Sequence, residues 1–240
     1  MTRALTARRP AVVTQPRWYL SLRSPYSWLT LHDAPSRHPD LWRDCELRVF
    51  FEPDDRTRAD LEPHRAAVPY VPMSRAKHLY ILRDVARLAR ERGLRPTWPV
   101  DRDPVWEVPS LPVLVALRSD PAAGRALALR LTRARWEEAQ DICDRQVVAR
   151  CATECGLSPD LGNSVDDPAA RELGVSALRA VHEDGVFGVP YVVVGREPFW
   201  GLDRLADAAA AHAARRAPGR GDQRMGAGTV PDGDHAGGCG

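Results

Sequence analysis

The chain of 240 residues has no long hydrophobic run. None of its apolar stretches approaches the ~18 consecutive residues that a membrane-spanning helix needs. The first residues, MTRALTARRPAVV, carry positive charge but no apolar core of the length found in signal peptides. The sequence therefore predicts a cytoplasmic protein that has no membrane as a partner.

Lysine is almost absent, since Lys77 is the single lysine and every other basic side chain is an arginine or a histidine. We interpret this bias as high-GC codon usage rather than as chemistry. The formal net charge of +2 argues against a surface dedicated to nucleic acid. With 44% hydrophobic and 28% charged residues, the composition is that of a globular protein. Its length suits one compact domain, or one domain with a large insertion.

The sequence also lacks a C-x-x-C motif, although it contains five cysteines. Cys151 and Cys155 are four residues apart in a predicted helix and would share one face. A zinc site would need further ligands at suitable spacing, which the surrounding sequence lacks. The sequence therefore predicts buried, reduced thiols and no metal site at Cys45, Cys143, Cys151, Cys155 and Cys239.

The first 55 residues predict a strand, a helix and a second strand. Residues 17–22 (RWYLSL) and 45–51 (CELRVFF) have the composition of strands, and residues 24–36 that of a helix. Such an opening favours two parallel strands joined by a right-handed crossover. From residue 56 to about residue 184 the pattern is mostly helical. The helices expected there cover residues 74–92, with Leu79, Leu82, Ala86 and Ala89 on one apolar face, and about 111–118, 121–136, 144–154 and 167–183.

Strand patterns return near the end of the chain. A β-branched run follows Pro190, Gly195-Arg196 can turn a hairpin into residues 197–200, and residues 201–214 predict a last helix. If the two ends join in one sheet, the fold is α/β and thioredoxin-like (βαβ…ββα) with a large all-helical insertion. The expected division is a disordered N-terminus (1–15), a thioredoxin-like domain (16–55 and 186–215), a helical insertion domain (56–185) and a disordered tail (216–240).

The junction of the first strand and helix carries the first candidate for chemistry. Ser24 precedes Pro25, and this pair is typical of a helix N-terminus, with serine as N-cap and proline in the first turn. Unpaired backbone N–H groups and the positive end of the helix dipole favour an anion or a thiolate there. An ordinary helix cap explains the same residues without any ligand.

The start and the end of the chain's structured part carry motifs that give a specific resemblance. SPYSWL at residues 24–29 resembles the SPYSYLA opening of 2-hydroxychromene-2-carboxylate isomerases and kappa-class glutathione transferases, two groups in the DsbA-like branch of the thioredoxin superfamily. GVFGVP at residues 185–190 and FWGLDRL at residues 199–205 resemble the ending of the same family. RAK at residues 75–77, DVAR at 84–87 and RARW at 133–136 are similar to its inner helices.

The resemblance implies roles for individual residues. Dithiol relatives carry cysteines where this chain has Ser24 and Ser27, so thiol–disulfide exchange is not expected at this site. Ser24 is the catalytic candidate, which would stabilise the thiolate of a bound thiol, and Ser27 would face its helix neighbours. Pro190 should follow a cis peptide bond and present the backbone of Val189 to glutathione. The other residues that would bind the cofactor are Leu202, Asp203 and Lys77.

Several aromatic side chains are candidates for lining a substrate pocket, namely Tyr26, Trp98, Trp106 and Trp200. Each of these, like Asp203 and Lys77, also has an ordinary structural explanation: a core aromatic, a carboxylate in the first turn of a helix, or a solvated lysine. Leu202 and Tyr191 replace polar residues of the family, and Ser110 is the candidate to replace a polar contact of the family that is missing here.

The resemblance implies an enzyme that uses glutathione or another low-molecular-weight thiol to isomerise an aromatic-derived small molecule. Two alternatives remain: a kappa-type glutathione transferase, and a DsbA-like binding protein without catalysis. Family members are often dimers, so a homodimer is possible, although nothing in the sequence identifies an interface.

Overall fold

The computed structural model describes residues 15–66, 68 and 74–216. Its sheet has four strands, in the order β2-β1-β3-β4: β1 (Arg17–Leu20), β2 (Glu46–Val49), β3 (Tyr191–Val194) and β4 (Glu197–Trp200). β1 runs parallel to β2 and antiparallel to β3, and β3 and β4 form a hairpin. The two ends of the chain thus meet in one sheet, which confirms the thioredoxin-like arrangement.

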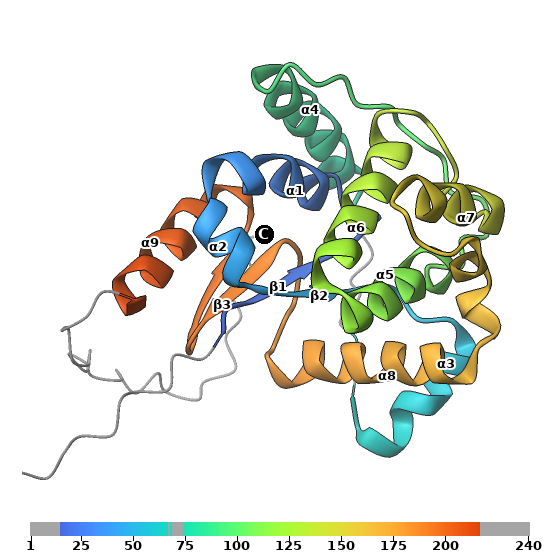
Figure 1. Ribbon diagram of the computed structural model, residues 1–240. Coiled ribbons are helices and arrows are strands. Elements are labelled where there is room, and N and C mark those ends of the chain that lie inside the picture. Colours follow the sequence, from blue (N-terminus) through green and yellow to red (C-terminus); the bar gives the residue numbers. More distant parts are fainter. Residues whose placement is uncertain (1–14, 67, 69–73, 217–240) are drawn as a thin grey trace, which may run out of the picture.

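Helices surround this sheet and fill the chain between β2 and β3 (Figure 1). The helices at the two ends are α1 (Pro25–Arg37), α2 (Pro39–Asp44) and α9 (Leu205–Arg216). Those between β2 and β3 are α3 (Asp55–Leu61), α4 (Arg75–Glu91), α5 (Glu107–Ser119), α6 (Pro121–Trp136), α7 (Arg145–Glu154) and α8 (Pro168–Glu183). Short 3₁₀ segments are η1 (Glu62–His64), η2 (Pro159–Asp166) and η3 (Leu202–Arg204).

The two faces of the sheet belong to different hydrophobic clusters because side chains alternate along a strand. Trp18 and Leu20 of β1 join the large core that includes α1, α2 and α9 and continues into the helical block. Tyr19 of β1 points to the other face, where it packs with Val181 of α8 and Tyr191 of β3. A third cluster joins α1, α4 and α6 through Trp28, Leu29, Val85, Ala89 and Trp136.

The predicted element types agree with the structure, and their bounds differ. β1 ends at Leu20 rather than at residue 22, because the chain turns there, with the Ser24 N–H donating to the Ser21 carbonyl at 3.0 Å. Helix α5 begins four residues earlier than predicted and includes Pro109 and Pro112. The short helix α2 was not predicted from the sequence. Arg216, expected in the tail, is the last residue of α9.

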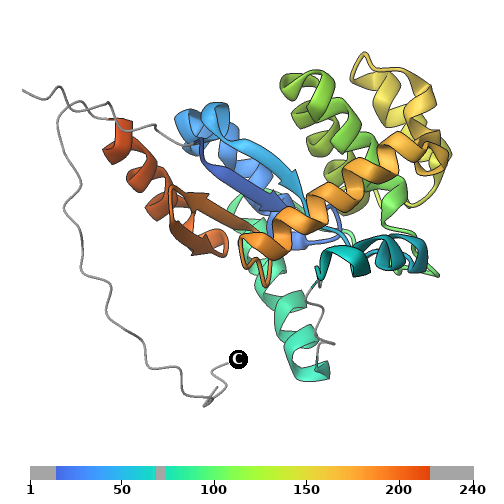
Figure 2. The same ribbon diagram turned by 90° about the horizontal axis from the view of Figure 1, so that it is seen from below.

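The apolar face predicted for α4 is correct at Ala89 and wrong at Leu79. The helix packs through Ile81, Val85, Leu88 and Ala89, while Leu79 is 43% exposed. The N-terminal half of α4 stands at the margin of the molecule in both views (Figures 1 and 2), so its apolar side chains find no core to join. Of the segments predicted to be disordered, 1–15 and 216–240, residues 1–14 and 217–240 lie outside the described residues, and with them Cys239.

Candidate active site

The tip of α1 has the cap that the sequence predicts. Ser24 has an extended backbone (φ −81°, ψ 122°), and its Oγ accepts a hydrogen bond from the Ser27 N–H at 3.2 Å. Pro25 occupies the first turn, which contains no acidic residue. The positive end of the helix dipole is therefore not neutralised by a carboxylate of its own first turn, and the site favours negative charge.

Ser27 has a structural role, as expected. Its side chain is completely buried, and its Oγ accepts a hydrogen bond from the Ser21 N–H at 3.1 Å. This contact holds the turn between β1 and α1. Ser27 therefore fixes the position of Ser24 and offers nothing to a ligand.

The loop before β3 lies at the same end of the sheet. Tyr19 pairs with Tyr191 in the antiparallel ladder, so the preceding residues Val189 and Pro190 come beside the end of β1 that leads to Ser24. The Val189–Pro190 peptide bond is cis, as the resemblance implied. The Pro190 carbonyl accepts a hydrogen bond from the Gly201 N–H at 3.0 Å, which brings the end of β4 to the same place.

The segment after β4 supplies Leu202 and Asp203. Leu202 packs in the cluster that includes Tyr26, so η3 lies against α1. Asp203 is exposed, and its Oδ2 is 3.7 Å from Nε of the neighbouring Arg204. Leu202 thus contributes an apolar contact, while the carboxylate of Asp203 remains open to solvent.

Tyr26 contacts the helix α4, and Lys77 is part of it. The Tyr26 hydroxyl donates to Oδ2 of Asp84 at 2.8 Å, and burial together with this hydrogen bond raises the pKa of Tyr26. Lys77 is exposed in the first turn of α4, seven residues before Asp84 and thus about 10 Å farther along the helix axis. The structure therefore places Tyr26 next to the tip of α1, whereas Lys77 belongs to the protruding half of α4.

The three candidate tryptophans have different environments. Trp106 is only 4% exposed, and the guanidinium groups of Arg23 and Arg135 lie over its ring, with Cζ atoms 5.5 and 5.1 Å from the ring centroid. We therefore correct its assignment from pocket lining to core. Trp98 is 41% exposed and meets Trp136 edge-on, and Trp200 is 51% exposed. Ser110 is buried within α5, so it offers no open polar contact.

Arg23, which immediately precedes Ser24, was missed by the sequence analysis. Its guanidinium forms ion pairs with Glu52 and with Asp101, where Nε lies 3.6 Å from Oδ2. Asp101 also binds Arg135, with Nη1 at 2.8 Å from Oδ1. This cluster links the turn before α1 to the loop before α5. In the sequence, the only sign that Arg23 belongs to the site is its position next to the Ser24-Pro25 pair.

No described cysteine lies at the tip of α1. Cys45, Cys143, Cys151 and Cys155 are free thiols in or against the core. Burial raises the pKa of Cys45 to about 11 and that of Cys143 to about 12. Such thiols are poor nucleophiles at neutral pH. Among the described residues, no group of three or more His, Cys, Asp or Glu side chains is placed to hold a metal ion.

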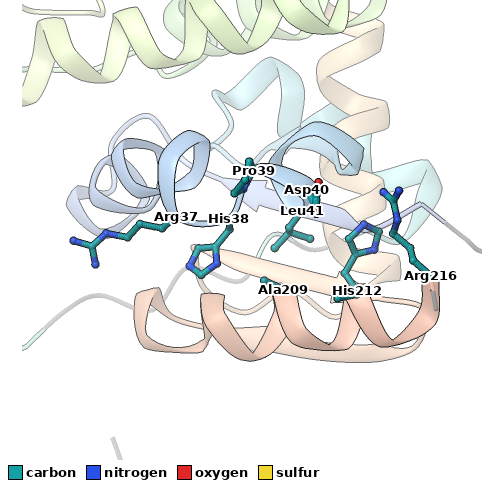
Figure 3. Close-up of a pocket in the computed structure, with 9 residues that line it drawn as sticks. Arg37, His38, Pro39, Asp40, Leu41, Ala209, His212 and Arg216 are labelled. Atoms are coloured by element: carbon teal, nitrogen blue, oxygen red, sulfur yellow. The ribbon is translucent and has the colours of Figure 1, made fainter.

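Two surface pockets lie away from the tip of α1. One, of about 440 Å³, lies between α2 and α9, where His38 and His212 face the gap (Figure 3). His212 is buried and its Nε2 lies 2.9 Å from Oδ2 of Asp44, so it joins the two helices. The other, of about 530 Å³, lies between α1 and α6 and is lined in part by Trp28 and Glu137. Ser24, Val189 and Asp203 line neither hollow.

Known proteins resemble this chain over most of its length. The model of the DSBA-like thioredoxin domain matches residues 17–213. A 2-hydroxychromene-2-carboxylate isomerase from Sphingobium xenophagum is 28% identical over 193 residues, which cover 78% of this chain and 92% of the relative.

Solved structures share the fold. A 2-hydroxychromene-2-carboxylate isomerase has a TM-score of 0.61 at 22% identity, with 83% of this chain and 94% of that chain covered. The cytosolic disulfide reductase DsbM from Pseudomonas aeruginosa, solved with GSH, has a TM-score of 0.51 at 18% identity, with 83% and 96% covered. In the described part of the chain, no helix combines the length and the apolar character needed to cross a membrane.

Proposed function

The chain belongs to the DsbA-like thioredoxin family, and from this premise we propose that it is an enzyme that uses a bound low-molecular-weight thiol, glutathione or a similar molecule, to isomerise an aromatic-derived small molecule. The proposed reaction resembles that of 2-hydroxychromene-2-carboxylate isomerase, the relative that is 28% identical. It takes place in the cytoplasm and involves no nucleic acid and no membrane. A homodimer and the division into a thioredoxin-like domain and a helical insertion domain are parts of the same proposal.

The observation that carries this proposal is the chemistry of the α1 tip. The Ser24 Oγ accepts the Ser27 N–H, and a hydroxyl that accepts one hydrogen bond still has its own proton to donate. A thiolate at the helix tip would receive that proton as a hydrogen bond and would also gain from the helix dipole. Both effects favour the charged form of the sulfur and lower its pKa. Serine at both positions of the dithiol pair leaves no disulfide chemistry at this place.

The reaction steps follow from an activated thiolate. The sulfur adds to a carbon that is conjugated with a carbonyl group, which forms a C–S bond and moves an electron pair to the carbonyl oxygen. The former double bond can now rotate. When the electron pair returns, the C–S bond breaks and the thiolate leaves. The substrate changes its geometry, the thiol is recovered, and neither is oxidised or reduced.

The remaining residues of the site would bind the thiol. The backbone N–H and C=O of Val189, next to Pro190, would pair with the cysteine unit of glutathione as a short β-bridge. Asp203 would accept the γ-glutamyl ammonium group, and Leu202 would pack beside it. In this proposal Lys77 binds a carboxylate of the thiol cofactor, and Tyr26, Trp98 and Trp200 contribute apolar contacts to the substrate.

A kappa-type glutathione transferase would use the same site and release the adduct as its product. Product analysis separates the two, because an isomerase consumes no thiol. A third candidate, a binding protein without catalysis, is favoured by the apolar packing of Leu202 against the cluster of α1 and α4.

The first experiment measures thermal unfolding with and without millimolar glutathione. A ligand at a hundred times its dissociation constant stabilises the folded state by about 2.7 kcal/mol. We expect a clear rise in the unfolding midpoint for the wild type and a smaller rise for Ser24→Ala. Ser24→Gly is the matched control, since glycine is a better N-cap than alanine but has no hydroxyl. If neither glutathione nor another biological thiol raises the unfolding midpoint of the wild type, the thiol site is absent.

A further inference from the structure

The pocket of about 440 Å³ between α2 and α9, which we call the α2–α9 pocket, has an apolar floor (Figure 3). Its lining residues on α9 share one face of the helix, since they are three or four positions apart: Ala209, His212, Ala213 and Arg216. Leu41 of α2 lines the opposite side. Its volume is within the range of about 300–1,000 Å³ that is usual for small-molecule sites.

His212 brings a buried hydrogen-bond acceptor to this pocket. The residue is 4% exposed, and its Nε2 lies 2.9 Å from Oδ2 of Asp44. Because a carboxylate can only accept, Nε2 carries the proton of the neutral ring and Nδ1 is an acceptor. Burial lowers the pKa of His212, which keeps the ring neutral at neutral pH. In the part of the chain that the structure describes, Nδ1 has no hydrogen-bond partner, so a ligand with an N–H or O–H group would satisfy it.

His38 brings a hydrogen-bond donor from the other side of the pocket. This residue joins α1 to α2, and its imidazole faces the same gap (Figure 3). Partial burial lowers the pKa of His38, so at neutral pH its ring is neutral and carries one N–H. The pocket therefore presents an acceptor on one side and a donor on the other.

The rim of the pocket has an excess of positive charge. Three arginines and two aspartates stand around it: Arg37, Arg43, Arg216, Asp40 and Asp44. Asp40 is paired with Arg43, and Asp44 with Arg216. Arg37 is 57% exposed, and its ion pair is long, at 3.5 Å, to a carboxylate that also binds a buried arginine. The rim therefore favours an anionic group of a ligand.

These groups together match one class of small molecule. Nδ1 of His212 needs a donor, the N–H of His38 needs an acceptor, the rim needs an anion and the alanine face of α9 needs an apolar group. An amide next to a carboxylate and a hydrocarbon side chain supplies all four. We propose that the α2–α9 pocket binds an N-acylated amino acid with an apolar side chain, and that His212 and His38 hold its amide. The site does not include Ser24 and needs no thiol.

The test is calorimetric titration of the full chain with N-acetylleucine at neutral pH, in the absence of any thiol. N-acetyl-N-methylleucine, which lacks the N–H donor, and N-acetylleucinamide, which lacks the carboxylate, should each bind about threefold to tenfold more weakly. In His212→Phe, which keeps a ring without nitrogen, N-acetylleucine and its N-methyl derivative should bind equally. A difference that persists in His212→Phe would come from the size of the methyl group and would overturn the role of His212.

Ala213→Leu and Ala214→Leu form a matched pair of variants. Both alanines are exposed on α9, but Ala213 lines the pocket and Ala214 does not. Ala213→Leu should weaken the binding of N-acetylleucine at least about tenfold, since it fills the pocket, and Ala214→Leu should leave it unchanged. Equal affinity of the two variants, equal affinity of the wild type for all three probes, or no binding by the wild type at millimolar concentrations would overturn the proposal. The stabilisation by glutathione should be the same in both variants, which separates this pocket from the thiol site.

Discussion

The Tyr19 hydroxyl donates a hydrogen bond to Oδ2 of Asp184 over a distance of 2.5 Å. Tyr19 belongs to β1, which leads to Ser24, and Asp184 is the C-cap of α8, from which the chain continues to Pro190. Arg17 binds the same carboxylate, with Nη2 at 3.0 Å from Oδ1. This contact therefore ties together the two segments that meet at the candidate site.

Replacing Asp184 by Asn should destabilise the protein in a pH-dependent way. Burial acts to raise the pKa of Asp184, but the hydrogen bonds from Arg17 and Tyr19 outweigh it and hold the pKa below its ordinary value. At neutral pH the loss should be about 1.5–3 kcal/mol of unfolding free energy, the usual value for a hydrogen bond to a charged group.

The sign of the pH effect follows from the depressed pKa. The carboxylate stabilises the fold fully above its unfolded-state pKa of about 3.9, and this contribution disappears as the pH falls through the lower folded-state value. Urea unfolding of the wild type and of Asp184→Asn at several pH values measures how much the carboxylate stabilises the fold at each pH. A free-energy difference that stays constant down to about pH 2 would contradict the prediction.

The ion pair between Asp33 and Arg92 should matter more than surface pairs. Asp33 in α1 and Arg92 at the end of α4 have side chains only 6% and 9% exposed, with Nη2 at 2.7 Å from Oδ2. Asp33→Ala leaves a buried guanidinium without its charged partner, which typically costs about 3–5 kcal/mol. Asp40→Ala is the control, because its ion pair with Arg43 is exposed. Equal midpoints of the two variants in urea would contradict this ranking.

The described cysteines should react slowly in the folded protein. Burial raises the pKa of Cys45, Cys143, Cys151 and Cys155, so few thiolates exist at neutral pH. In a Cys239→Ser background, Ellman's reagent should modify the unfolded chain much faster than the native one. A native thiol that reacts as fast as free cysteine would reveal a nucleophile within the chain and would remove the need for an external thiol.

The strands and helices at the two ends of the chain could be predicted from the sequence, because the patterns that mark them are local. The apolar run of β1, the Ser24-Pro25 helix start and the β-branched run after Pro190 each act within a few residues. The order of these elements, βαβ at the start and ββα at the end, then predicted that the two chain ends join in a single sheet. The cap at the tip of α1 was predicted from the same local signals, and the cis bond before Pro190 was predicted from the family resemblance.

The features that the sequence analysis missed depend on distant contacts. Trp106 packs in the large core and against Arg23 and Arg135, which come from separate segments. The contact between Phe187 and Trp200 exists only because β3 and β4 form a hairpin, and no local pattern encodes it. The apolar residues of α4 predicted a buried face around Leu79, but the inner face is set by where α1 and α6 lie.

The central claim is that the α1 tip stabilises a thiolate, and titration of the bound thiol tests it most directly. The ultraviolet absorbance of the thiolate is followed against pH for glutathione bound to the wild type and to Ser24→Ala, with protein carrying S-methylglutathione as the blank. We expect the bound thiol of the wild type to titrate at least about one pH unit below the ordinary thiol pKa of about 8.5, and that of Ser24→Ala closer to it. If the bound thiol titrates at the ordinary value, or equally in both proteins, Ser24 does not stabilise a thiolate and the proposed mechanism is wrong.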